Sequence, residues 1–177
     1  MAEFVRLYRV FVGAPSDVTE EHTIISGLVE EWNRHHGPDA HARLEFMNWQ
    51  THSHPAAGKR PQALINKQVV DKCDIMVGLF RARFGSPTGV AHSGTEEEIR
   101  RSIRKRKQVM VYFADLPEPK GQKASGEFAA IEKFKQRFGT RALYHTYTDL
   151  GAFEKAFRQH LAAAMSELLA KETKRLK

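Results

Sequence analysis

The segment CDIMVGLF, residues 73–80, is the feature that most restricts how this chain can fold. Apart from Asp74 the segment is almost continuously apolar, and a loop containing Gly85, Pro87 and Gly89 follows it. Such a run is typical of a strand that is buried on both faces. The segment QVMVYFA at 108–114 has the same character. Strands of this kind need helices on both sides of their sheet, so these two segments predict an α/β fold.

Segments with strand and helix patterns alternate along the chain. In the first predicted helix, Ile24, Ile25, Leu28, Val29 and Trp32 fall at helical spacing and form an apolar stripe. The expected strands are 6–12, 42–49, 73–80, 108–114 and 142–147; the expected helices are 16–34, 61–71, 95–105, 128–138 and 149–172; and 50–60 and 115–126 are expected to be loops. This order predicts one domain, residues 1–177, with a parallel sheet of about five strands between two helical layers. We expect 6–12, 75–80 and 109–113 to lie side by side at its centre.

Several helix ends carry recognisable signals. Ser16 or Asp17 is expected to cap the first long helix, and Asp149 the last. Pro61 stands at the first position of a predicted helix, where its missing N–H has no consequence. Thr95 and Glu98 have the spacing of a capping box, in which the two side chains satisfy the first N–H groups of a helix.

Composition limits the possible classes of protein. The single cysteine, Cys73, excludes a disulfide framework and is expected to be a small core residue. No apolar run reaches the roughly 18 residues of a membrane helix. We therefore expect a cytoplasmic protein that does not span a membrane. Nine histidines are present, but neither H-E-x-x-H nor a cysteine partner accompanies them, so no metal site is predicted.

The formal charge of +7 raises the question of a nucleic acid partner. Much of the excess lies at 100–107 and 171–177. The first cluster falls where a helix should end and where cations complement the helix dipole. Nucleic acid is therefore not expected as a partner. We interpret 165–177 as a basic helix end that could lead into a further domain.

Three loops should meet at the carboxyl edge of the predicted sheet, where ligands bind in such folds. The loop of Gly13, Ala14, Pro15, Ser16 and Asp17 could hold a phosphate against the next helix, or could simply be a tight turn. It contains neither a P-loop nor a dinucleotide fingerprint. The residues leave these two interpretations equally open.

The loop after the most buried strand is the second candidate. Arg81 and Arg83 could bind a phosphate through two hydrogen bonds each, and Phe84 could stack on a ring. The alternative is a loop whose glycines and proline only shape a turn. The third candidate is Glu98, which either caps its helix or acts on a glycosidic bond as a nucleophile or hydroxyl-orienting group.

The motifs around Glu98 resemble two related families. Ser93-Gly94-Thr95-x-x-Glu98-Ile99 after a strand like CDIMVGLF resembles the nucleoside 2-deoxyribosyltransferases, in which this Glu is the nucleophile. The same frame, with the opening VFVGAPSDV, resembles Toll/interleukin-1 receptor (TIR) domains. The arrangement from Arg60-Pro61-Gln62 and Asn66 to Ser93-Gly94-Thr95 is most similar to TIR-like domains at the N-termini of signalling or defence proteins.

The resemblance implies a flavodoxin-like, TIR-like three-layer sandwich. It also implies an NAD hydrolase that cleaves the nicotinamide–ribose bond, with Glu98 as the catalytic residue. NAD or a related nucleotide would be the substrate, no cofactor is expected, and copies would assemble through TIR–TIR contacts that use segment 50–60. The alternatives are a non-catalytic interaction module and a deoxyribosyltransferase-like enzyme. The expected substrate-binding residues are Gly13, Ala14, Pro15, Ser16, Asp17, Trp49, Phe80, Arg81, Arg83, Phe84, Gly85, Ser86, Thr88, Ser93, Gly94 and Thr95.

Overall fold

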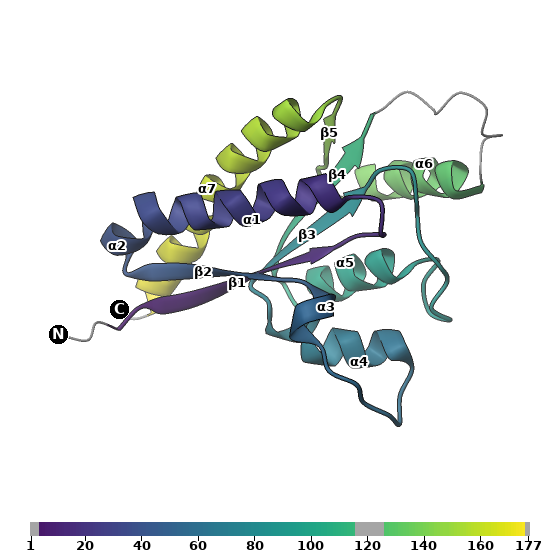
Figure 1. The fold of residues 1–177 in the computed structure, drawn as a ribbon, viewed down its shortest axis with the longest axis horizontal. Coiled ribbons are helices and arrows are strands. Elements are labelled where there is room, and N and C mark those ends of the chain that lie inside the picture. Colours follow the sequence, from purple (N-terminus) through teal and green to yellow (C-terminus); the bar gives the residue numbers. More distant parts are fainter. Residues whose placement is uncertain (1–3, 116–125, 176–177) are drawn as a thin grey trace.

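The computed structural model describes residues 4–115 and 126–175, and its centre is a five-stranded parallel sheet (Figure 1). The strands are β1 (Arg6–Gly13), β2 (Ala42–Met47), β3 (Ile75–Phe80), β4 (Gln108–Ala114) and β5 (His145–Tyr147). Their order in the sheet is β2-β1-β3-β4-β5, which is the doubly wound, flavodoxin-like arrangement. The predicted fold class and the central position of β1, β3 and β4 are confirmed.

Helices cover both faces of the sheet. They are α1 (Thr19–His35), α2 (Gly37–Ala40), α3 (Trp49–His52), α4 (Pro61–Gln68), the 3₁₀ helix η1 (Val70–Lys72), α5 (Gly94–Arg104), α6 (Gly126–Gly139) and α7 (Leu150–Arg175). In Figure 1, α1 and α7 lie on one face, and α4, α5 and α6 lie on the other. In the described part of the chain, no helix has the length and apolar character that a membrane span needs.

Each face of the sheet has its own apolar core. Val10, Val77 and Tyr112 belong to the cluster under α1 and α7. Phe11, Met76 and Phe113 belong to the cluster under α5 and α6. Every residue of β3 is buried, as expected for the middle strand of a sheet with two covered faces.

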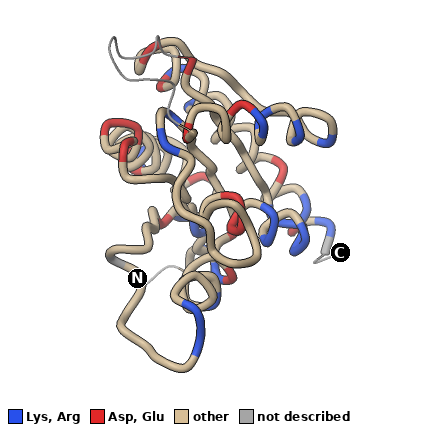
Figure 2. The backbone as a smooth tube through the Cα atoms, turned by 90° about the vertical axis from the view of Figure 1, so that its right-hand side faces the viewer, with Lys and Arg blue, Asp and Glu red and all other residues tan. Residues whose placement is uncertain are grey.

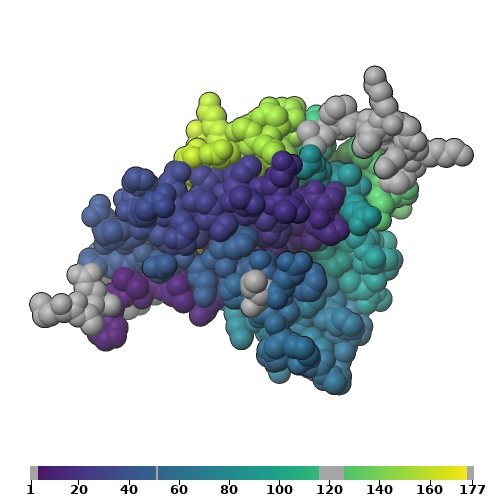
Figure 3. Space-filling view, in the orientation of Figure 1, coloured from purple at the N-terminus to yellow at the C-terminus, as the bar shows by residue number. Residues whose placement is uncertain are grey.

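Parallel pairing brings the carboxyl ends of the central strands to one edge. Gly13 pairs with Gly78 of β3, and Phe80 pairs with Phe113 of β4. The β1–α1 loop, the β3–α5 loop and the start of α3 therefore gather at this edge. Figure 3 shows α1 and the α3–α4 region side by side on one surface of the molecule.

Several predicted ends differ from the structure. Neither Ser16 nor Asp17 caps α1: the cap is Val18, and no side chain bonds to the free N–H groups there. Asp17 instead accepts hydrogen bonds from the backbone N–H groups of Ala82 and Arg83, at 2.8 and 3.0 Å, so it anchors the β3–α5 loop. The Asp149 cap is confirmed, with its Oδ1 accepting from the N–H of Ala152 at 2.8 Å.

Other elements are shorter or longer than the sequence suggested. The second strand ends at Met47, because Trp49 begins the short helix α3. The helix from Pro61 ends at Gln68 and continues as η1 after Val69. The predicted 115–126 loop falls largely outside the described residues. Segment 53–60 has no regular structure, and Figure 2 shows it as a projecting loop that carries basic residues where it enters α4.

Candidate functional site

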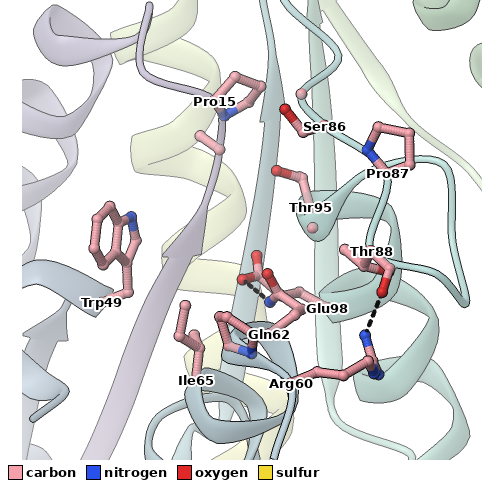
Figure 4. A pocket seen from close by; sticks show the side chains of 14 residues that line it. Pro15, Trp49, Arg60, Gln62, Ile65, Ser86, Pro87, Thr88, Thr95 and Glu98 are labelled. Atoms are coloured by element: carbon pink, nitrogen blue, oxygen red, sulfur yellow. Dashed lines mark hydrogen bonds between the residues drawn. The ribbon is translucent and has the colours of Figure 1, made fainter. Parts of the chain in front are cut away.

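A cleft of about 460 Å³ lies at the carboxyl edge of the sheet. Its size is within the range of small-molecule sites, roughly 300–1,000 Å³. The cleft is bounded by the β1–α1 loop, α3, the first turns of α4, the β3–α5 loop and the first turn of α5 (Figure 4). Its lining residues are Ala14, Pro15, Trp49, Arg60, Pro61, Gln62, Ile65, Gly85, Ser86, Pro87, Thr88, Gly94, Thr95 and Glu98.

Glu98 lies at the base of this cleft. Glu98 is only 5% exposed, and its Oε1 accepts a hydrogen bond of 2.8 Å from Nε2 of Gln62. Figure 4 shows these two side chains facing each other, with Trp49 on one side. A Cβ atom at Gly13 would overlap Oε2 of Glu98, so the carboxylate rests against the last residue of β1 and depends on its having no side chain.

Three consecutive glutamates open α5, and all three are buried. Each step along a helix turns the side chain by about 100°, so the three carboxylates point in different directions. Glu96 pairs with Arg100 at 2.7 Å and with Arg137 at 3.6 Å. Glu97 pairs with Arg60 at 3.0 Å. For Glu98, no basic group within the described ranges lies within 4.0 Å of the carboxylate.

These surroundings separate the acidities of Glu97 and Glu98. Burial raises the pKa of Glu98 to about 8; the Gln62 hydrogen bond opposes this effect and the charge of Glu97 adds to it. Burial acts in the same direction on Glu97, but hydrogen bonds from Arg60, Thr88 and Asn66 lower the pKa of that carboxyl overall. Two adjacent carboxyls with opposed pKa shifts are typical of functional sites.

The predicted capping box is wrong. The residue before the helix, Ser93, caps α5, and its hydroxyl accepts from the N–H of Glu96 at 3.1 Å. Thr95 and Glu98 lie inside the helix, each two residues beyond the positions that a capping box would require. The interpretation of Glu98 as a capping residue therefore fails, and its burial at the base of the cleft has no capping role to explain it.

Arg60, which lines the cleft at the start of α4, connects two other segments that border it. One guanidinium nitrogen donates to the carbonyl of Thr88 at 2.7 Å, and the other donates to Glu97 at 3.0 Å. Asn66 also donates to Glu97, at 2.8 Å. Gly85 and Gly89 have φ values of 94° and 90°, which glycine adopts without strain. The ion pair thus joins α4, α5 and the 85–89 turn.

The structure brings about half of the predicted site residues to one place. Those that line the cleft with Glu98 are Ala14, Pro15, Trp49, Gly85, Ser86, Thr88, Gly94 and Thr95. Gly13, the last residue of β1, does not line the cleft but lies against the carboxylate of Glu98. Those that do not line it are Ser16, Asp17, Phe80, Arg81, Arg83, Phe84 and Ser93.

The arginines and phenylalanines of the β3–α5 segment face elsewhere. Arg81 lies 3.3 Å from Glu20 and 3.6 Å from Glu21 on α1. Arg83 donates to the hydroxyl of Ser16 at 3.2 Å. Phe84 is 3% exposed and stacks on Phe80 with ring centres 5.4 Å apart. None of these side chains lines the cleft, and each has a partner outside it.

Arg60, Pro61, Gln62, Ile65 and Pro87 line the cleft but were not among the predicted site residues, and of these Gln62 is the one that bonds to Glu98. It reaches Glu98 because α4 begins at Pro61 and directs its first turn over α5. Gln62, Ile65 and Asn66 repeat at helical spacing, and this pattern is the signal that could have identified one face of α4. Gly94 leaves room for this contact, because a Cβ atom there would overlap the amide of Gln62.

Neither a metal centre nor a reactive thiol emerges from the described residues. No group of three or more His, Cys, Asp or Glu side chains in these ranges could hold a metal ion. Cys73 is 2% exposed, and burial raises the pKa of its thiol to about 11. Its predicted role as a core residue is confirmed.

Comparisons with known proteins identify a family. A family model described as "Domain of unknown function (DUF4062)" matches residues 9–162, and the chain belongs to this family. Among curated proteins, no significant match was found. A similar solved structure is oxidised flavodoxin 1 from Bacillus cereus, which is 11% identical, with 91% of this chain and 97% of that chain covered and a TM-score of 0.41.

Proposed function

We propose that this DUF4062 domain is a TIR-like NAD hydrolase that cleaves the bond between nicotinamide and ribose. The reaction consumes NAD⁺ and water and gives nicotinamide, ADP-ribose and a proton. The C–N bond breaks with its electron pair leaving on the nicotinamide nitrogen, and water supplies the new C–O bond. The motif Gly94-Thr95-x-x-Glu98-Ile99, which resembles TIR domains and nucleoside 2-deoxyribosyltransferases, supports Glu98 as the catalytic residue.

The observation that carries the proposal is a buried carboxyl at the base of an open cleft, with no cationic partner among the residues that the structure describes. Burying such a group costs free energy unless a positive charge compensates it. The nicotinamide ring of NAD⁺ carries that charge, and so does the ribosyl group as the bond breaks. Substrate binding would therefore favour the ionised form of Glu98, and the carboxylate would in turn stabilise the positive charge of the substrate.

The leaving group also matches the site. Nicotinamide departs as a neutral molecule and needs no proton from the protein. The charged residues that line the cleft are Glu98 and Arg60, and Arg60 is committed to Glu97 and Thr88. A carboxylate that stabilises positive charge, without an acid beside it, fits the cleavage of a pyridinium glycoside better than the release of a neutral nucleobase.

The remaining side chains have roles that follow from their positions. Gln62 holds one oxygen of Glu98 at 2.8 Å and leaves the other to act on the anomeric carbon or on the ribose hydroxyls. Trp49, 46% exposed at the edge of the cleft, offers an aromatic face to a flat ring. The hydroxyls of Ser86 and Thr95, which also line the cleft, would provide hydrogen-bonding groups for the sugar.

Self-association is the proposed means of activation. Segment 54–60 is exposed and joins α3 to α4, and both of these helices line the cleft. A neighbouring copy that bound this segment would act on Trp49 and Arg60 together. Turnover per mole of domain is therefore expected to rise with protein concentration.

The test is to incubate the purified domain with NAD and to measure released nicotinamide by liquid chromatography. A series spanning a hundredfold dilution tests activation by assembly, and Glu98→Gln is the negative control. Nicotinamide from the wild type but not from the variant supports the proposal. A folded domain that releases none at any concentration, or a Gln variant that equals the wild type, would refute it and favour a non-catalytic interaction module.

A further inference from the structure

A second cavity, of about 520 Å³, adjoins the cleft of Glu98. It lies between the β1–α1 loop, the first turns of α1 and the end of β2. Its lining residues are Ala14, Pro15, Ser16, Val18, Thr19, His22, Thr23, Ser26, Phe46, Asn48, Trp49 and Gln50. Ala14, Pro15 and Trp49 line both cavities, so the two are separated only by this shared wall.

The second cavity is lined by both polar and apolar side chains. Among the described residues that line it there is no Lys, Arg, Asp or Glu. Its one ionisable ring is His22; burial lowers the pKa of this imidazole, although the charge of Glu21 opposes the effect, and so favours its neutral form. Hydroxyls from Ser16, Thr23 and Ser26 stand beside these groups. A neutral ligand with hydrogen-bonding edges suits such a lining; Arg83 donates to Ser16 at 3.2 Å but is not itself a lining residue.

Aromatic rings complete the surface. His22 and Phe46 form an edge-to-face pair with ring centres 6.0 Å apart. Trp49 contributes a half-exposed indole to the boundary between the cavities. Rings next to hydroxyls and amides bind flat heterocycles, which stack through their faces and form hydrogen bonds through their edges.

The position of Glu98 in the first cleft indicates which half of NAD would bind in each cavity. If Glu98 acts on the nicotinamide–ribose bond, this end of NAD occupies the first cleft. The other half of the molecule then extends past Pro15 and Trp49, the residues common to both cavities. A purine base is the neutral, flat group at that end of the molecule.

We propose that the second cavity is the purine-nucleoside subsite of this domain, formed by α1 and the end of β2. The assignment to NAD rests on the proposed function, but the binding of adenosine itself does not. Ser26, half-buried on α1, and Thr23, one turn nearer its start, are the residues to alter, because neither lines the cleft of Glu98.

The binding experiment uses the Glu98→Gln domain and adenosine, followed by calorimetry and by tryptophan fluorescence. Ser26→Phe would fill the cavity and is expected to weaken adenosine binding by about tenfold or more, as steric loss of a ring site does. Thr23→Val removes a hydroxyl at nearly constant volume and is expected to weaken binding less. Ser166→Phe, on an exposed position of α7, is the matched control and should leave adenosine binding unchanged.

The kinetic experiment compares NAD with nicotinamide mononucleotide, which has the same scissile bond but no adenosine. Ser26→Phe in the active domain should raise KM for NAD by about tenfold with kcat retained, and should leave the mononucleotide unaffected. Adenosine that fails to bind, or that binds Ser26→Phe and Thr23→Val as well as the parent domain, would overturn the subsite. Equal losses for both substrates would do the same.

The two proposals can fail separately. Adenosine binding that Ser26→Phe removes, in a folded domain that cleaves neither substrate, would retain the subsite and refute the NAD hydrolase. Cleavage of both substrates with no effect of Ser26→Phe would retain the hydrolase and refute the subsite. Circular dichroism of each variant establishes that it is folded, and Thr23→Val decides the outcome if Ser26→Phe is not.

Discussion

Two carboxyl groups near opposite ends of α5, those of Asp71 in η1 and Glu98 in α5, have opposite electrostatic surroundings. Near the C-terminal end of α5, Asp71 lies 2.6 Å from Arg101 and 2.9 Å from Lys105. Arg101 makes two hydrogen bonds to it, which with Lys105 lower its pKa to about 2. Near the N-terminal end, Glu98 has the amide of Gln62 as its partner, and burial raises its pKa to about 8.

The contrast separates a structural carboxyl from a functional one. Asp71 is ionised at every ordinary pH and joins η1 to α5, so its contacts stabilise the fold. Glu98 opposes folding whenever it is ionised, because the described surroundings provide no compensating charge. A destabilising group that is retained at the base of a cleft is a candidate for chemistry.

Replacing the unpaired carboxyl should have the largest effect. Glu98→Gln keeps the shape of the side chain but removes its charge, so it should reduce NAD cleavage by about a thousandfold, as loss of a main electrostatic contact does. Single-turnover release of nicotinamide measures this effect. The result would be contradicted by a folded Gln variant with more than a tenth of wild-type activity.

The same variant also changes how stability depends on pH. Because the pKa of Glu98 is raised from 4.5 to about 8, the folded protein binds one more proton than the unfolded chain between these values. The contribution of Glu98 is thus most favourable below pH 4.5 and is lost as the pH rises to about 8, by roughly 1.4 kcal/mol per pH unit. In urea unfolding, the free energy of unfolding of the Gln variant relative to that of the wild type should therefore increase as the pH rises from 4.5 to about 8. A constant difference would exclude the raised pKa.

Gly13→Ala should displace the carboxylate without removing it. The new methyl group would overlap Oε2 of Glu98, and a shift of about 1 Å in a reacting group can cost a hundredfold in rate. Gly27→Ala is the control, because a Cβ atom there meets nothing within 4 Å and favours the helix. Equal NAD turnover by the two variants would show that the contact with β1 does not position Glu98.

Gln62→Leu should shift the pH at which activity appears. The Gln62 hydrogen bond lowers the pKa of Glu98, so its loss should raise that pKa further and reduce kcat/KM at pH 7 by about tenfold. The rise of kcat/KM with pH should move to a higher pH. Gln68→Leu, on the same helix but bonded to His54, should leave the profile unchanged. An unshifted profile for the Gln62 variant would deny it a positioning role.

Asp71→Asn should have the smallest effect. It removes a partly exposed ion-pair cluster and should cost about 1 kcal/mol of stability at pH 7, with unchanged turnover by the folded protein. Because the pKa of Asp71 is lowered from 3.8 to about 2, its stabilisation is present above pH 3.8 and disappears as the pH falls through 2. Thermal unfolding at pH 7 and at pH 2 measures both. A strong loss of activity would remove the distinction between the two ends of α5.

Local sequence patterns were enough to predict the sheet and to identify Glu98 as a candidate site residue. The apolar run of β3 required helices on both faces, and the alternation of elements then led to parallel pairing with β1, β3 and β4 at the centre. These inferences succeeded because burial on two faces and helical spacing are local patterns. Two helix caps were predicted wrongly. Ser93 caps α5 in place of Thr95, and Val18 stands at the cap position of α1 in place of Ser16 or Asp17.

Tertiary packing determines which charged side chains are already paired and which could contact a ligand. Three adjacent glutamates look alike in sequence, but Arg137 and Arg60 reach Glu96 and Glu97 from other elements and leave Glu98 to Gln62. In the same way, Arg81 is occupied by Glu20 of α1, so it is not at the cleft. Each of these pairings joins residues far apart in the chain. Their formation depends on how helices pack across the sheet, and no local pattern contains that information.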